Sequence, residues 1–354
     1  MKHLKKLRLS TTVLLGLLTF SCQDDINISE EEKKTDLNER IEIELGEKLQ
    51  NPYSVKNMRR ALTTLSKNEN TFSKIAFKSN ETSEQLITTT HLYVKFKPKT
   101  EEELDIIKKD TTLFLFDYPL DYVISDEGDY YHDPEVPKGQ PTYQYTSVLA
   151  GYDFPENVEY EILEELFIPE ENDEQEEEKS LLETEYKQKL SKLQESVTIE
   201  IDDKKDDILL ALVDKSLEMT GNLDPSEKEN TASERCWFCR PSKWTPHGYI
   251  RVYDTTLRRW VGLEGVKIRV GRWFTWRHGI VDSSGYYRTS QFRRSVRYKM
   301  DWERYHFALR SGGFSSAQHR GPYKRGTWDW SISSGVHQYY AHIFRAAYHY
   351  YYKD

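Results

Sequence analysis

Two cysteines, Cys236 and Cys239, stand three positions apart, and this spacing allows three kinds of chemistry. In an oxidising compartment two such thiols can close a disulfide, which is the interpretation we favour. A thioredoxin-like redox pair needs its first cysteine at the start of a helix that follows a strand, whereas this pair follows a polar stretch. A zinc site needs two further ligands, and only His247 is near. We therefore predict a structural disulfide, with no metal and no cofactor.

Histidines near the end of the chain are the other side chains with catalytic potential. His342 and His349 share one helix face with Arg345 between them, whereas His337 is rotated away from that face. This spacing is poor for a single metal ion, so we expect buried or interfacial histidines. The alternative is that they belong to an active site, and the chain is then the front half, or a shortened form, of a metallopeptidase-like enzyme.

Motifs of common enzyme classes are absent from the sequence. The chain contains no His-Glu-x-x-His, no Gly-x-Ser-x-Gly and no glycine-rich phosphate loop. The signals of zinc hydrolases, serine hydrolases and nucleotide-binding enzymes are therefore missing. We predict no catalytic residue and expect a binding protein rather than an enzyme.

A third cysteine, Cys22, stands in a different setting near the N-terminus. Four basic residues precede the apolar stretch 13–18, and the small residue Ser21 directly precedes Cys22. This order is typical of a signal peptide that is cut by a bacterial lipoprotein signal peptidase, so we predict that Cys22 is lipidated. Thr19 departs from the pattern, in which a leucine is usual. The Gln-Asp-Asp segment at 23–25 resembles the tail of surface-exposed lipoproteins of Bacteroidetes-type bacteria, which implies a lipid anchor in the outer membrane and a surface-exposed protein.

Basic and aromatic side chains are concentrated in residues 235–354, which hold 22 Lys and Arg against 7 Asp and Glu, and all eight tryptophans. Such a mixture suits nucleic acid, but the predicted location argues against that partner. Outside the cell, exposed aromatic rings stack on sugars and arginines pair with anionic polysaccharide, although most tryptophans are expected in the core. The candidate ligand-binding residues are Trp273, Trp276, Arg272, Arg277, Trp328 and Trp330.

Composition and periodicity divide the chain into segments that position these residues. Apolar residues recur every three or four positions from Ser54 onwards, which predicts an amphipathic helix. The predicted segments are a lipoprotein signal peptide (1–22), a polar tether (23–50), an amphipathic helix and connector (51–84), a small α+β domain (85–170), an acidic helical linker (171–234), a basic aromatic β-sandwich (235–335) and an aromatic helix (336–354).

The small α+β domain is predicted from β-branched and aromatic runs and from one helix signal. Strands are expected at 92–96 and 143–149, and a strand pair at 111–122. Thr100 opens a capping box before a helix, and a second, short helix is expected at 158–166. In the later β-rich segment, alternation predicts strands at 249–253, 266–273, 280–281, 286–289, 296–302 and 306–309.

A turn inside the β-rich segment carries a resemblance to a known family. Asp282 is expected to accept hydrogen bonds from turn amides while Gly285 takes a positive φ, which closes a hairpin. The Gly-Val strand at 265–266 followed by Asp-x-x-Gly-x-Tyr at 282–287 resembles the carboxypeptidase regulatory-like (transthyretin-like) β-sandwich family. The resemblance spans roughly 249–310. It implies a non-catalytic accessory or adhesion module and transfers no catalytic residue.

The final helix has bulky residues on nearly every side, so it favours burial. It can pack across the sandwich or pair with another subunit, and a structural assembly subunit is therefore a further alternative. Together, these patterns predict an α+β N-terminal domain joined by a helical acidic linker to an all-β sandwich with a C-terminal helix. The expected function is a lipid-anchored cell-surface binding or adhesion protein that recognises a polysaccharide or a protein partner.

Overall fold

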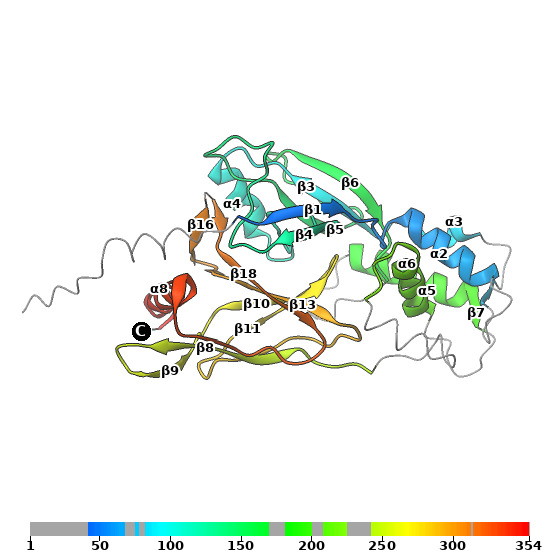
Figure 1. The fold of residues 1–354 in the computed structure, drawn as a ribbon. Coiled ribbons are helices and arrows are strands. Elements are labelled where there is room, and N and C mark those ends of the chain that lie inside the picture. Colours follow the sequence, from blue (N-terminus) through cyan, green and yellow to red (C-terminus); the bar gives the residue numbers. More distant parts are fainter. Residues whose placement is uncertain are drawn as a thin grey trace, which may run out of the picture. The chain divides into compact units, whose positions relative to one another are not determined.

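The computed structural model describes residues 42–67, 75–77, 82–169, 181–199, 208–224, 242–312 and 314–353. All of them belong to one unit, which spans residues 40–354. The described part combines helices with mostly antiparallel strands, and its C-terminal region is rich in strands (Figure 1). The fold class is therefore mixed α/β with a β-rich C-terminal region.

The first helix, α2 (Val55–Lys67), forms as the sequence predicts. The Ser54 hydroxyl accepts a hydrogen bond from the amide of Asn57 at 3.2 Å, which caps the helix. The apolar positions that predicted the helix are the buried ones, and they share a core with α5 (Leu181–Ser196) and α6 (Ile208–Met219). Both of these helices lie in the segment expected to be a helical linker.

A three-stranded antiparallel sheet follows α2, in the order β5-β3-β6. Thr100 precedes α4, and its hydroxyl accepts a hydrogen bond from the amide of Glu103 at 3.3 Å. The predicted strands at 92–96 and 143–149 and the helix after Thr100 are thereby confirmed. The bounds are β3 (His91–Phe96), α4 (Glu101–Lys109), β5 (Gln144–Leu149) and β6 (Tyr160–Leu166).

Two predictions in this region are wrong. The helix expected at 158–166 is strand β6, because its glutamates line an edge strand beside lysines of β3 and its flank, as Glu161 does with Lys97 at 2.8 Å. The strand pair expected at 111–122 is irregular chain with one isolated bridge at Phe116, since β4 (Tyr122–Asp126) begins only at its end and pairs with β1 (Glu44–Lys48).

The β-rich region contains two four-stranded sheets (Figure 1). One has the order β11-β10-β13-β18, and the other the order β12-β8-β19 with β9 also paired to β8. The strands predicted at 249–253, 266–273, 286–289 and 296–302 are confirmed, whereas β9, β18, β19 and most of β11 had not been predicted. The bounds are β8 (His247–Asp254), β9 (Arg259–Gly262), β10 (Lys267–Arg272), β11 (Thr275–Ile280), β12 (Tyr286–Arg288), β13 (Val296–Asp301), β18 (Gln318–Lys324) and β19 (Trp330–Ile332).

Short elements complete the described part. The strand expected at 306–309 is the two-residue β15, which forms a tight hairpin with β14. The bounds are β2 (Ile75–Phe77), α3 (Ser83–Leu86), β7 (Val197–Ile199), β14 (Glu303–Arg304), β15 (Phe307–Ala308), β16 (Arg310–Gly312) and β17 (Ser315–Ser316).

The turn at Asp282 has the predicted geometry but a different role. Asp282 Oδ1 accepts hydrogen bonds from the amides of Ser284 (2.8 Å) and Tyr286 (3.0 Å), and Gly285 has a φ of 91°. The expected hairpin does not form, because β11 pairs with β10 while β12 pairs with β8. The carbonyl of Gly285 accepts instead from the amide of Ile250 at 2.8 Å. The turn therefore carries the chain from one sheet to the other.

The two sheets share one hydrophobic core. Ile268 of β10 and Met300 of β13 are fully buried there, together with Ile250 and Val252 of β8. The alternate residues of β10 and β13 are charged and lie on the opposite face of their sheet. The same alternation that builds the core therefore gathers charges on one surface.

The final helix, α8 (Gly335–Tyr352), buries only part of its surface. It packs along β8, where Arg345 forms an ion pair with Asp254 at 2.6 Å. Packing across the β-rich region was one of the expected outcomes, and the structure confirms that one. Tyr339 and Tyr350 nevertheless remain 58% and 82% exposed.

Candidate functional site

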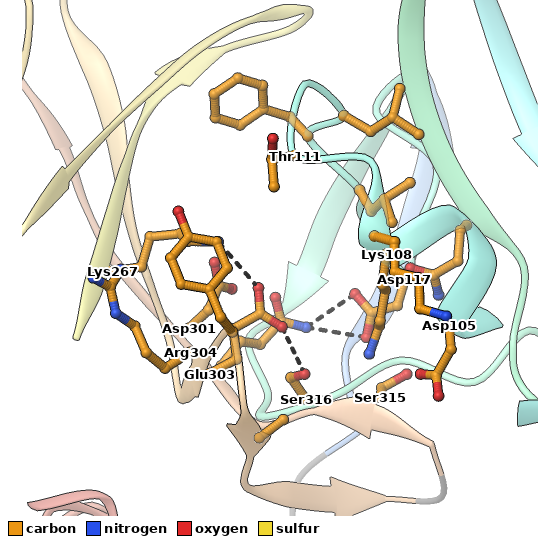
Figure 2. A pocket seen from close by; sticks show the side chains of 18 of the residues that line it. Asp105, Lys108, Thr111, Asp117, Lys267, Asp301, Glu303, Arg304, Ser315 and Ser316 are labelled. Carbon is orange, nitrogen blue, oxygen red and sulfur yellow. Dashed lines mark hydrogen bonds and ion pairs between the residues drawn. The ribbon is translucent and has the colours of Figure 1, made fainter. Parts of the chain in front are cut away.

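A pocket of about 590 Å³ is lined by α4, the loop that follows it and the charged face of the sheet β11-β10-β13-β18. Figure 2 shows side chains of α4, among them Asp105 and Lys108, across the pocket from Glu303 and Arg304. This volume suits a small ligand or one unit of a polymer.

An ion network on β10, β13 and β14 forms the sheet side of the pocket. Arg269 pairs with Asp301 at 2.5 Å and with Glu303 at 3.0 Å. Lys299 binds Asp301 at 3.1 Å, and Lys267 lies 3.6 Å from Glu303. Buried charges persist in a protein when they are paired in this way. Both carboxylates of the network are thus neutralised by the protein's own cations.

The surroundings lower the pKa values of both Glu303 and Lys267 in this network. Burial acts to raise the pKa of Glu303, but the charges of Arg269 and Lys267 outweigh it and hold that pKa well below 4.5. Burial, together with the charge of Arg269, lowers the pKa of Lys267. Glu303 therefore stays ionised and serves as a fixed acceptor in the pocket wall.

Asp117 is a fully enclosed carboxylate between the loop after α4 and β18. The side-chain amide of Gln318 donates to both of its oxygens, at 3.1 and 3.2 Å, and the amide of Tyr131 donates at 3.0 Å. Burial raises the pKa of Asp117, against the nearby charge of Lys299. These contacts make Asp117 a structural anchor for the loop.

The helix side of the pocket is positioned by the end of α4. Lys108 and Lys109 occupy its last turn, where the partial negative charge of the helix C-terminus favours cations. Asp110 then accepts hydrogen bonds from the amide (2.9 Å) and hydroxyl (2.6 Å) of Thr112, which turn the loop along the pocket. At the rim, Arg310 forms an ion pair with Glu101.

Three cations at the pocket have no carboxylate partner within the described residues. Lys108 and Lys109 make no ion pair there. Arg304 also makes none, and it lies over the rings of Tyr305 (4.9 Å) and Tyr352 (5.9 Å). The Nε of Arg304 is buried and has no hydrogen-bond partner in this part of the chain. The terminal nitrogens of Arg304 are not among the buried unpartnered atoms, and an anionic group in the pocket would accept hydrogen bonds from them.

The six residues predicted to bind ligand do not line this pocket. Arg272, Trp276, Arg277 and Trp328 are buried, and Trp273 and Trp330 are half-buried. Trp276 packs on Phe116 at 4.9 Å, and Trp330 stacks on His319 at 3.9 Å. A ligand role for these six stays a prediction.

The other predicted site residues also lie apart from the pocket. His337 lies beside His319, with ring centroids 4.8 Å apart, and Arg345 of the same helix is paired with Asp254. Among the described residues, no three His, Cys, Asp or Glu side chains are grouped to hold a metal. Cys22, Cys236 and Cys239 lie outside the described residues.

The pocket residues were missed by sequence reasoning, although a signal was present. Charged residues alternate with apolar ones at Lys267 and Arg269, and again at Lys299, Asp301 and Glu303. A strand with this pattern has one apolar face and one charged face. The sequence does not show that both charged faces meet the end of α4, some 160 residues earlier.

No known protein family matches the chain, and neither does any curated protein or any solved structure. No helix within the described ranges is long and apolar enough to cross a membrane.

Proposed function

We propose that the protein is a non-catalytic binding protein, held by a lipid on Cys22 at the surface of a bacterial outer membrane, which takes an acidic group of a polymer ligand into the pocket. The observation that carries the proposal is Arg304, a half-buried arginine at the pocket that has no carboxylate partner in the described part of the chain. Lys108 faces the same space from α4.

The charge pattern of the pocket supports binding of an anion. Asp301 and Glu303 are neutralised by Arg269, Lys299 and Lys267, so they do not compete for Arg304. An arginine that is preorganised and partly desolvated binds a carboxylate through charge-assisted hydrogen bonds. The site thus offers fixed acceptors beside free cations, which suits a ligand that carries both hydroxyl and acidic groups.

The architecture of the β-rich region is consistent with this function. The two sheets contribute side chains to one core, which supports our proposal that they form a β-sandwich of the transthyretin-like type. The Asp282 turn of the motif makes the expected hydrogen bonds, although it links the two sheets instead of closing a hairpin. A module of this type would present loops and short hairpins for binding, without catalytic residues.

Lipidation is tested separately from ligand binding. Metabolic labelling with a fatty acid should mark the wild-type protein and place it in the membrane fraction. Cys22→Ala should abolish the label and release the protein. A Cys22→Ala protein that still partitions with membranes would overturn the anchoring part of the proposal.

Ligand binding is tested by calorimetry on the full chain in detergent. The probes are oligomers of galacturonate, mannuronate and hyaluronan, with cello-oligosaccharides as neutral controls. We expect an acidic oligomer to bind, and Arg304→Gln to weaken its affinity by about tenfold or more, since a hydrogen bond to a charged group contributes about 1.5–3 kcal/mol.

Matched variants make the binding result specific to the pocket. Lys108→Gln should also weaken binding, whereas Arg60→Gln and Lys56→Gln, at exposed positions of α2, should not. The proposal fails if none of the acidic oligomers binds, or if Arg304→Gln binds as well as the wild type.

A further inference from the structure

We infer that the pocket is one end of a longer surface that binds a polysaccharide chain, with sugar units stacked on an aromatic rim beside it. The aromatic rim consists of Tyr305, His306, Phe307 and Tyr351. This inference rests on the proposed function and adds to it the class of ligand and a second set of binding residues.

The β14–β15 hairpin presents one half of the rim. Its two-residue turn places Tyr305 and His306 at the tip, and both line the pocket together with Phe307 of β15. Tyr305 is 70% exposed. Large aromatic rings are usually buried at least in part, and exposed apolar side chains that lie together can mark a binding site. The guanidinium of Arg304 lies 4.9 Å from this ring. The cation proposed to bind the acid and the exposed ring are therefore adjacent.

The end of α8 supplies the other half of the rim. Tyr351 is 49% exposed and stacks on His306, with centroids 5.7 Å apart and planes at 9°, and on Phe307 at 5.7 Å and 17°. The Nδ1 of His306 lies 2.7 Å from the hydroxyl of Tyr352, which fixes the orientation of the imidazole. The rings of His306, Phe307 and Tyr351 are thus held nearly parallel before a ligand arrives, which reduces the entropy lost on binding.

The chemistry around the rim favours a saccharide over a nucleic acid, although both stack on aromatic rings. The pocket beside the rim contains Asp105, which is exposed and has no partner among the described residues, and Glu101 at its edge. The phosphodiester backbone of DNA carries no hydroxyl that could donate a hydrogen bond to these carboxylates. Sugar hydroxyls can donate to them, while a uronic acid group at Arg304 supplies the negative charge.

The length of the ligand is the measurement that tests this inference. Calorimetry with galacturonate oligomers of two and of six units should show at least tenfold tighter binding of the longer one. Tyr351 does not line the pocket, so Tyr351→Ala should remove most of this difference and leave the affinity for the dimer nearly unchanged, because the dimer occupies only the pocket. Tyr305→Ala should also reduce the difference, but it should weaken binding of the dimer as well, because Tyr305 lines the pocket.

Tyr339→Ala is the matched control. Tyr339 is 58% exposed on the same helix as Tyr351, and it lies twelve positions before Tyr351, which corresponds to about 18 Å along the axis. This variant should bind both oligomers as the wild type does. Circular dichroism and the melting temperature of each variant establish that it is folded.

Different failures have different meanings. If Arg304→Gln weakens binding but both oligomers bind equally well, or if Tyr305→Ala leaves the length dependence intact, the inference is overturned and the proposed function stands. If neither oligomer binds, the inference is overturned. The proposed function then fails as well if none of the other acidic oligomers binds. Tighter binding of a hexathymidylate than of the galacturonate hexamer would overturn the inference in favour of single-stranded nucleic acid.

Discussion

On one face of the sheet β11-β10-β13-β18, Ile268 and Met300 are fully buried in the shared core, whereas on the opposite face Arg269, Lys299 and Asp301 meet the pocket. The core face is stabilised by removing apolar surface from water, which needs no particular direction. The pocket face is tolerated only because each charge has a partner in a definite position. One set of strands therefore contributes to the hydrophobic core on one side and lines the pocket on the other.

The largest effect is expected on the core face, at Trp302. This side chain is fully buried, with Phe344 at 6.1 Å and Tyr340 at 5.8 Å. Trp302→Ala should lower the free energy of unfolding by about 3–5 kcal/mol, because it removes apolar contacts and leaves a cavity. Urea denaturation followed by fluorescence measures the loss.

A control of the same residue type defines what burial contributes. Trp260→Ala, at a position that is 46% exposed on β9, should change the free energy of unfolding by no more than about 0.5 kcal/mol. If Trp302→Ala does not fold, Trp302→Phe can replace it in the experiment. This variant keeps an aromatic ring and should cause a smaller loss in the free energy of unfolding. Equal losses for Trp302→Ala and Trp260→Ala would break the comparison.

The next effect is expected on the pocket face, at Asp301. Asp301→Asn keeps the shape of the side chain but leaves Arg269 and Lys299 without their shared counter-charge. The free energy of unfolding should fall by about 3 kcal/mol, since a buried charge loses its partner. Asp126→Asn, at an exposed position of β4, serves as the control in the same urea titration. If Asp301→Asn leaves the free energy of unfolding unchanged, water must screen these charges more strongly than their burial indicates.

Acidification should reveal titratable groups on the core face. His319, which pairs in register with Met300, and His337 are half-buried, and desolvation lowers their pKa values from 6.5 to about 3 and about 4. On acidification the unfolded chain binds protons first, so stability should fall as the pH drops from about 6.5 towards 4. The expected slope is about 1–2 kcal/mol per pH unit in this window.

The histidine prediction is measured by urea denaturation at pH 7, 6 and 5. His337→Gln should make the fall between pH 6 and 5 shallower, because one of the two groups no longer titrates. His349→Gln, at an exposed position of the same helix, is the matched control. An unchanged slope in His337→Gln would show that other groups dominate the acid response.

The smallest effect is expected at the rim of the pocket. The ion pair of Arg310 with Glu101 joins side chains that are 41% and 42% exposed, so water screens it. Arg310→Ala should change the free energy of unfolding by less than about 1 kcal/mol, and this change should shrink further in 1 M salt. A larger loss in the free energy of unfolding would show that the ion pair of Arg310 with Glu101 also stabilises the pocket face.

Local rules predicted the elements whose determinants lie close together in sequence. Ser54 and the apolar positions after it define α2, and Thr100 defines the start of α4. The Asp282 turn has the predicted bonds because donor and acceptor are two to four residues apart. In each case the interactions that stabilise the element join residues that are close together in sequence.

Elements that depend on distant partners were not predictable in the same way. Strand β6 has a helix-like composition, and it is a strand because β3 supplies both its hydrogen bonds and the lysines beside its glutamates. The pocket requires the end of α4 to meet Arg269, whose guanidinium donates to the carbonyl of Leu115 at 2.6 Å. Hydrophobic periodicity indicates the type of an element and its apolar face, but it does not indicate which distant element will contact it.

The parallel pairing of β8 with β19 also bears on the order of folding. Ile250 of β8 lies opposite Trp330 of β19, eighty positions later in the chain. Contacts of such long sequence separation close slowly, because a long loop must be ordered before they form. The sheet around β8 can therefore be completed only after β19 is available, and a chain truncated before Trp330 would leave one edge of β8 open to pairing with other chains.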